Sequence, residues 1–199
     1  DVKSNYDTDL FEYLTNYVAT FLGTEYGKDN ETDISIRVLS DHARAVTFLI
    51  SDGVIPSSEG RGYVARRILR RAVRHNKKLG ISDPFLHNLV GLVVEEMKSF
   101  YPELGSQKDN IISIVINEEK KFLSTIDRGF DQLKEAMSMS SRTKVLSGKD
   151  VFKLYDTYGF PVDLIEDIVS ETDYVLDMKA YEEEMLNQKN SSKKASKFK

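Results

Sequence analysis

The sequence predicts an all-α protein. We expect a helical bundle that contains one long helix and that can form two helical subdomains. Apolar residues recur at steps of three and four along most of the 199 residues, which is the spacing of amphipathic helices. Gly, Pro, Asn and Asp clusters separate these runs, as expected for turns. The runs of β-branched residues are too short and too helix-periodic to predict a sheet. With 40% hydrophobic and 30% charged residues, the composition is that of a globular protein with a real core.

Two helices are predicted in the first third of the chain. Asp7 and Thr8 are good caps for a first helix that ends at Gly23. Its apolar face is expected to consist of Leu10, Leu14, Tyr17, Val18 and Phe21. The second helix ends at Asp52-Gly53. Its apolar face is expected to consist of Leu39, Ala43, Val46 and Ile50.

A basic helix is predicted at residues 60–79, with Ser57 and Ser58 as caps ahead of it and Gly80 after its end. Its basic side chains, with no acidic residue among them, are Arg61, Arg66, Arg67, Arg70, Arg71, Arg74, Lys77 and Lys78. At about 100° per residue, those from Arg66 onward fall within roughly 140° of the helix circumference, and apolar residues occupy much of the rest. Because the whole chain has a formal charge of −4, so concentrated a cationic face predicts contact with a polyanion.

Arginine outnumbers lysine on this face, which favours phosphate groups because the guanidinium fork matches two phosphate oxygens. The candidate phosphate-binding residues are Arg61, Arg66, Arg67, Arg70, Arg71, Arg74 and Lys77. The alternative is a solvated helix whose arginines pair with local carboxylates. That alternative is less favoured, because no Asp or Glu lies four residues from an arginine within the run.

An apolar helix from about Pro84 to Phe100, closed by Tyr101-Pro102, precedes the longest predicted helix, at about residues 109–137. The residues that follow three- and four-residue steps along this long helix are Ile112, Val115, Glu119, Phe122, Ile126, Gly129, Leu133 and Met137. Such a seam packs lengthwise against another helix. Glu119 interrupts it, and we expect this glutamate at the edge of the seam or paired with a nearby cation.

The polar break at residues 138–142 is the expected subdomain boundary. It separates a first helical subdomain, 1–137, from a second, 143–189. Short helices are predicted in the second subdomain at 149–156, 162–170 and 178–189. Residues 190–199 are rich in Ser and Lys and predict a disordered basic linker.

The residues offer no convincing catalytic or metal site. The chain has no cysteine, which excludes disulfides and Cys-based zinc sites and favours a reducing compartment. The histidines His42, His75 and His87 do not form a His-x-x-x-His pair. Gly60-Arg61-Gly62 lacks the rest of a nucleotide-binding fingerprint, and Asp41-His42 is best interpreted as structural. No apolar run has the length of a membrane span, and no signal peptide is visible.

Five segments of the chain together resemble one family. They read SNYDTDLF at 4–11, RVLSDHARAVTFLISDGVIP at 37–56, GRGYVARRILRRAVRHNKKLG at 60–80, NEEKKF at 117–122 and LYDTYGFPVDL at 154–164. In this order they are similar to alanyl-tRNA synthetases, and the similarity extends to about residue 185. The resemblance implies the all-helical tRNA-recognition region that follows the class II catalytic core. The chain begins at Asp1 without a methionine and reads as an excerpt of something longer.

The resemblance also implies partners and cofactors. The full enzyme would use ATP to attach alanine to tRNA(Ala), with ATP and Mg²⁺ bound in a catalytic core upstream of this chain. An editing domain with zinc ligands would follow downstream. We expect no cofactor in this fragment, no activity of the fragment alone, no membrane partner and a cytoplasmic location, with an organellar form left open. Its partners would be the tRNA(Ala) acceptor stem and the catalytic and editing domains of the same chain.

Members of the family identify their tRNA by a G·U pair in the acceptor stem. In that wobble pair the guanine 2-amino group has lost its pairing partner and faces the wide, shallow minor groove of A-form RNA. A carboxylate suits this donor because it only accepts hydrogen bonds. By resemblance the reading aspartate is Asp156, and a second reader, Asn in the family, falls on Ser58. The alternative function is a protein-interaction scaffold whose basic helix binds an acidic partner.

Overall fold

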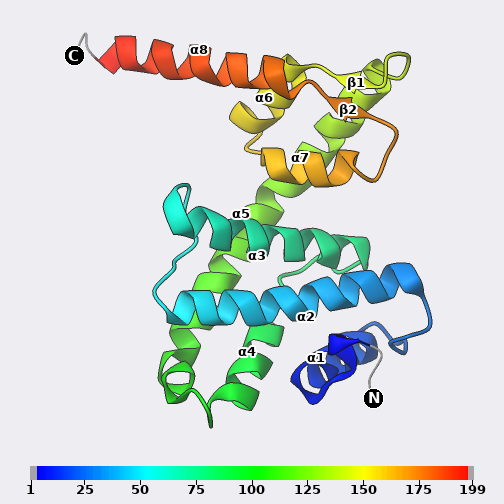
Figure 1. Ribbon diagram of the computed structural model, residues 1–199, viewed down its shortest axis with the longest axis vertical. Helices are drawn as coiled ribbons and strands as arrows, with labels where there is room; N and C mark the ends of the chain where they lie inside the picture. Colours follow the sequence, from blue (N-terminus) through cyan, green and yellow to red (C-terminus); the bar gives the residue numbers. More distant parts are fainter. Residues whose placement is uncertain (1–3, 197–199) are drawn as a thin grey trace. The chain divides into compact units, whose positions relative to one another are not determined.

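The computed structural model describes residues 4–196 and is predominantly helical (Figure 1), which confirms the predicted all-α class. The elements in chain order are η1 (Asn5–Asp7), α1 (Asp9–Phe21), α2 (Asn30–Ser51), α3 (Gly60–Lys78), α4 (Leu86–Met97), α5 (Pro102–Met139), β1 (Val145–Leu146), α6 (Gly148–Asp156), α7 (Val162–Val169), β2 (Val175–Leu176) and α8 (Met178–Ser196).

The chain divides into two compact units, Asp1–Leu123 and Ser124–Lys199, and the division falls inside α5. It therefore lies earlier than the boundary expected at 138–142. The reason is that the second part of α5 packs against the residues that follow it. The Phe130 and Phe160 rings lie 5.5 Å apart, and the Phe160 ring also covers Gly129. The polar break after α5 is only a turn within the second unit.

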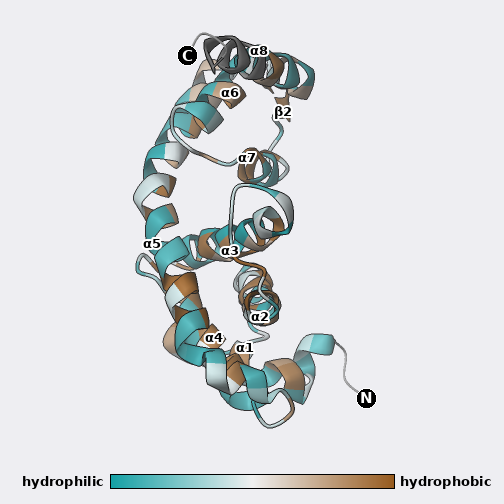
Figure 2. Cartoon of the chain, turned by 90° about the vertical axis from the view of Figure 1, so that its left-hand side faces the viewer, coloured by the Kyte–Doolittle hydropathy of each residue, from teal (hydrophilic) through white to brown (hydrophobic). Residues whose placement is uncertain are grey.

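In the first unit, α2 packs against α1, α3 and α4 (Figure 1), and the same helices carry apolar and polar faces (Figure 2). The predicted apolar face of α2 is confirmed, since its four residues are at most 2% exposed. The predicted face of α1 is only partly correct. Leu14 and Val18 are buried, but Leu10 is 48% and Phe21 57% exposed.

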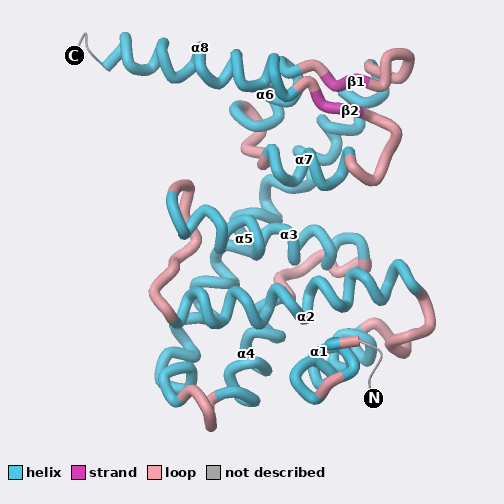
Figure 3. The backbone as a smooth tube through the Cα atoms, in the orientation of Figure 1, coloured by secondary structure: helices cyan, strands magenta, loops and turns pink. Residues whose placement is uncertain are grey.

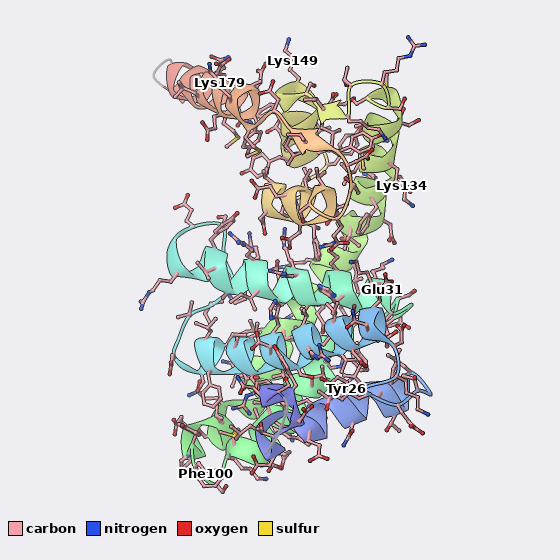
Figure 4. All side chains as sticks on the ribbon, turned by 45° about the vertical axis from the view of Figure 1, so that its right-hand side comes forward. Tyr26, Glu31, Phe100, Lys134, Lys149 and Lys179 are labelled. Carbon is pink, nitrogen blue, oxygen red and sulfur yellow. The ribbon has the colours of Figure 1, made fainter. Side chains whose placement is uncertain are left out.

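The first unit also holds its loops by polar contacts. Tyr26, labelled in Figure 4, precedes α2, and its hydroxyl oxygen accepts a hydrogen bond from Nε of Arg37 at 2.6 Å. The Arg37 guanidinium lies over both the Tyr26 and the Tyr6 rings, at 5.4 and 5.9 Å. Arg37 therefore ties η1 and the loop before α2 to the body of that helix.

Helix α5 begins at Pro102 and not near residue 109. Pro102 was expected to close the preceding helix, but proline also suits the first position of a helix, where its missing N–H costs no hydrogen bond. The seam along α5 is confirmed as core at Val115, Phe122, Ile126 and Leu133, which are at most 1% exposed, whereas Ile112 and Met137 are only half-buried.

The second unit contains the helices α6, α7 and α8 and one short parallel strand pair (Figure 3). In that pair Val145 lies opposite Val175 and Leu146 opposite Leu176. Two-residue strands have no periodicity to detect, so the sequence did not predict them. Helix α8 runs to Ser196, so the expected disorder of residues 190–199 is wrong up to that point. Residues 197–199 of the predicted linker lie outside the described part of the chain.

Candidate nucleic-acid interface

The first turn of α3 is set by a close contact with the loop before it. The backbone N–H of Ser57 donates to the carbonyl of Gly62 at 3.0 Å. A Cβ at position 62 would lie 2.2 Å from Oγ of Ser57, so only glycine fits there. Glu59 is the N-cap residue, and Oγ of Ser57 donates to its carbonyl. The expected capping by Ser57 and Ser58 is thus wrong, and Ser58 lies exposed beside the helix start.

The cations of α3 do not form one uniform face. The exposed members are Arg61, Arg67, Arg71 and Lys78. Arg66, Arg70 and Lys77 are half-buried, whereas Arg74 is only 3% exposed. Leu69, Ala72 and Val73 form the buried back of the helix, but Val64 is 53% exposed, so the predicted apolar face is only partly correct. The predicted phosphate-binding residues therefore differ widely in how much of each side chain reaches solvent.

Glu118 of α5 is the carboxylate that the sequence did not reveal. Its Oε1 accepts hydrogen bonds from Nε and Nη2 of Arg70, at 3.0 and 2.8 Å, and lies 3.3 Å from Nε of Arg66. The Arg70 guanidinium also lies over the Phe122 ring, at 4.8 Å from its centroid. Arg70 therefore does pair with a carboxylate, but that carboxylate lies 48 residues along the chain, so the pairing is not the local one that the alternative described.

The neighbouring Glu119 binds the start of α4. Its Oε1 accepts from the backbone N–H groups of Phe85 and Leu86, and its Oε2 from that of His87, at 2.8 to 3.1 Å. Nδ1 of His87 also lies 3.1 Å from Oε2. Glu119 is 0% exposed, so it lies inside the seam and not at its edge. The carboxylate supplies acceptors for N–H groups that a helix start leaves unpaired, and the positive end of the helix dipole favours it.

The histidines have structural surroundings. Nδ1 of His75 lies 3.0 Å from Oγ of Ser35, and both residues are buried. Burial lowers the pKa of His75 to about 4, and the charge of Arg74 acts in the same direction. His42 lies 3.1 Å from the Asp41 carboxylate. Among the described residues, no three His, Cys, Asp or Glu side chains are grouped to hold a metal ion.

Asp156 belongs to the second unit and is the last residue of α6. Its side chain is exposed, and its Oδ1 accepts a hydrogen bond from Nε2 of Gln188 in α8. The chain then turns through Gly159, with φ at +65°, a conformation that favours glycine. Phe160 is fully buried after the turn and anchors it. The predicted turn thus presents the Asp156 carboxylate at a helix end.

Comparison with known proteins identifies the family. All of residues 1–199 match the family described as tRNA synthetases class II (A). The chain belongs to the alanyl-tRNA synthetase family. An alanine–tRNA ligase of Pseudothermotoga lettingae is 48% identical over 194 residues, and one of Natranaerobius thermophilus is 47% identical over 197. Each match covers 98% of this chain but only 22% of the relative, so the chain spans about a fifth of the length of these ligases.

The buried contacts of α5 involve a segment that resembles the family. In this alanyl-tRNA synthetase chain, Glu118, Glu119 and Phe122 all come from the segment at 117–122 that carried part of the resemblance. That segment served as a family signature, and no role was predicted for Glu118. The signal that could have found this contact was a pair of adjacent glutamates, one of which interrupts an otherwise apolar seam. Along the described part of the chain, no helix has the length and apolar character of a membrane span.

Proposed function

We propose that this chain is the tRNA-recognition region of an alanine–tRNA ligase, and that it binds the acceptor stem of tRNA(Ala) at its G·U pair. The observation that carries the proposal is the row of exposed arginines on α3, in a chain of this family whose overall charge is −4. A concentrated cationic surface on an acidic protein suits a phosphate backbone.

Phosphate anchoring is assigned first to Arg61, Arg67 and Arg71, because these side chains are exposed along one helix. Such contacts fix the position of a stem without reading its sequence. Each phosphate that is neutralised releases condensed counterions, so binding should weaken steeply as salt rises. Arg66, Arg70, Arg74 and Lys77 complete the proposed set, with less of each side chain at the surface.

Base-pair reading is assigned to Asp156, with Ser58 as a second reader. The Asp156 carboxylate is exposed at the end of α6 and has one oxygen, Oδ1, already bonded to Gln188. Its other oxygen, Oδ2, is the acceptor that we assign to the guanine 2-amino group. Ser58 is exposed at the start of α3, and its hydroxyl can donate or accept from close to the backbone.

The proposal extends to the whole ligase. A catalytic core preceding this region would bind ATP and Mg²⁺ and activate alanine, and an editing domain with zinc would follow it. The chain itself should then support no ATP–pyrophosphate exchange with alanine. Exchange catalysed by the purified 199-residue chain would contradict this assignment of the catalytic core. The cytoplasm is the proposed location.

A gel-shift experiment tests the reading of the base pair. The chain is titrated onto an acceptor-stem hairpin carrying the G·U pair and onto its G·C counterpart at moderate salt. Asp156→Asn should lose most of the preference for G·U, by about 1–3 kcal/mol, because an amide nitrogen replaces one carboxylate acceptor. Glu183→Gln is the matched control, since it removes the same charge from an exposed position of α8.

The outcomes distinguish specific reading of the G·U pair from electrostatic attraction to any RNA stem. An unchanged preference in Asp156→Asn would remove Asp156 from the proposal. Equal binding of both hairpins by the unaltered chain would favour the scaffold alternative, in which the basic helix binds an acidic partner. One observation favours that alternative, because Arg70 of α3 already donates two hydrogen bonds to a carboxylate, that of Glu118.

A further inference from the structure

In the first unit, three guanidinium nitrogens lie close to one carboxylate oxygen, Oε1 of Glu118. Oε1 of Glu118 accepts from Nε and Nη2 of Arg70, and Nε of Arg66 lies 3.3 Å away. The Glu118 side chain is 7% exposed, compared with 20% for Arg70 and 28% for Arg66. The carboxylate thus lies beneath the helix surface, and the two arginines cover it. One buried negative charge is shared by two cations that face solvent in part.

Arg70 is committed to this arrangement. It makes two hydrogen bonds to the carboxylate, and its guanidinium lies over the Phe122 ring at 4.8 Å. Charge-assisted bonds of this kind are short and strong, and a desolvated cation over an aromatic face gains further attraction. A phosphate would have to replace both the carboxylate and the ring to bind Arg70 in the same way.

Arg66 stands in a different relation to the same oxygen. Its Nε approaches to 3.3 Å, but this buried nitrogen has no hydrogen-bond partner among the described residues. Oε1 already accepts two bonds from Arg70, so its lone pairs are occupied in the directions that Arg70 takes. The negative charge therefore attracts Arg66 without consuming its donors. A buried donor without an acceptor is rare and requires an explanation.

We propose that Glu118 is a positioning residue of the RNA-binding face, which withholds Arg70 from RNA and holds Arg66 where its guanidinium meets one phosphate. This inference rests on the proposed function and corrects it in one respect, because Arg70 leaves the set of phosphate contacts. The consequence is a defined number of contacts. Removal of the Glu118 charge should free Arg70 and add one phosphate contact to the face.

The salt dependence of binding counts these contacts. The logarithm of the binding constant falls linearly with the logarithm of the salt concentration, with a slope near −0.7 to −0.9 per phosphate neutralised. The slope is measured with the 199-residue chain and the G·U acceptor-stem hairpin. The variants are Arg66→Gln, Arg70→Gln, Glu118→Gln and the double variant Arg70→Gln/Glu118→Gln. Thermal unfolding of each variant is recorded alongside.

The variants are expected to change the slope in opposite directions or not at all. Arg66→Gln should make the slope shallower by roughly 0.7–0.9, and Arg70→Gln should leave it unchanged. Glu118→Gln should make it steeper by the same roughly 0.7–0.9, and the double variant should return it to the original value. Glu95→Gln is the matched control. Its carboxylate also holds two cations, Lys98 and Lys108, but it lies on α4, and its loss should not change the slope.

Three results would overturn the inference. The first is an equal loss of slope in Arg66→Gln and Arg70→Gln. The second is no change of slope in Arg66→Gln. The third is a Glu118→Gln variant that melts at a lower temperature but keeps the original slope, which means a purely structural role. Where Arg70→Gln alone does not fold, the double variant compared with Glu118→Gln gives the contribution of Arg70.

These failures differ from a failure of the proposed function. A chain that binds both hairpins equally, but shows the expected slopes, keeps the inference about phosphate contacts and loses the reading of the G·U pair. A chain that binds neither hairpin loses both.

Discussion

The two units of the chain have cores of different chemistry. Of the side chains whose burial the structure describes, the buried polar and charged ones are Thr15, Asp33, Ser35, Ser40, Thr47, Arg74, His75, Asn76, Glu118 and Glu119. All of them lie in the first unit, Asp1–Leu123. The buried side chains of the second unit are apolar, and two of its glycines, Gly129 and Gly148, have neighbours where a Cβ would be.

This difference shows two ways of specifying how helices meet. In the first unit, buried acceptors such as Glu119 need donors at a fixed distance and direction, so a wrong pairing leaves polar groups unsatisfied. In the second unit, Gly129 lets the Phe160 ring approach the α5 backbone, so shape decides the contact. Changes of charge should therefore be felt most in the first unit, and changes of volume in the second.

Glu119→Ala should have the largest effect. It removes the acceptors of three backbone N–H groups at the start of α4 and leaves a cavity in the core. We expect a loss of about 3–5 kcal/mol in the free energy of unfolding, the usual cost of removing one member of a buried charged network. Urea unfolding gives the total, and hydrogen exchange should show faster exchange in α4. Protection in α4 equal to that of the unaltered chain would contradict the capping role.

The control is Glu95→Ala, a glutamate of the same helix pair that lies at the surface. Its carboxylate lies 2.5 Å from the amino groups of Lys98 and Lys108, which lowers the pKa of Glu95 to about 2. Both bonds are exposed, and exposed ion pairs contribute little to stability. A small loss in the free energy of unfolding for Glu95→Ala, beside a large loss for Glu119→Ala, would show that the contribution of a glutamate to stability depends on its burial and not on its number of partners.

The pH dependence of stability tests the contribution of the buried His75 to the polar core of the first unit. The pKa of His75 is about 4 in the fold and 6.5 ordinarily, because burial and neighbouring cations disfavour the charged ring. Between these values the unfolded chain binds the proton more readily, so stability from this residue is present above pH 6.5 and is lost as pH falls toward 4. Between pH 7 and 4.5 we expect about 2–3 kcal/mol of this loss. His75→Gln should unfold with a weaker pH dependence, and an identical pH dependence would refute the shift.

The sequence predicts features that depend on local spacing better than contacts between residues that are distant in the chain. Periodicity located the helices and the apolar face of α2, because that face depends only on local spacing. It did not find the partner of Arg70, since Glu118 lies 48 residues away and such a pairing depends on how α3 and α5 meet. It failed at Pro102, where the same residue suits the end of one helix and the start of the next.

The candidate site was predictable only in part. Composition indicated the cations of α3, but not which of them are buried, because burial of Arg74 depends on packing beyond the helix. Asp156 and Ser58 came from family resemblance, and the structure adds that both are exposed. The contact of Asp156 with Gln188 joins residues on separate helices, so no local sequence pattern predicts it.

Gly129→Ala tests the second unit by volume. The added Cβ would lie 2.0 Å from a carbon of the Phe160 ring, which is fully buried. We expect a loss of about 1–3 kcal/mol from overpacking, with faster hydrogen exchange around Phe160. Gly91→Ala in α4 is the matched control, because the added Cβ would lie 3.7 Å from its nearest neighbour, Cδ1 of Ile112, which is an ordinary van der Waals distance. That variant should be neutral or more stable by up to about 1 kcal/mol, since alanine favours helices over glycine.

Tyr174→Phe should have the smallest effect, and it compares the two ends of helices. The Tyr174 hydroxyl donates to the carbonyl of Met137 at 2.8 Å, which satisfies one of the acceptors left unpaired at the end of α5. Glu119 caps a helix start with a buried charge, whereas Tyr174 caps a helix end with one neutral bond. Phenylalanine keeps the ring that lies 4.4 Å from the Lys144 ammonium, so only the hydroxyl is lost. We expect about 0.5–1.5 kcal/mol by urea unfolding. A loss as large as that of Glu119→Ala would mean that the second unit also depends on polar contacts, and the contrast between the two cores would fail.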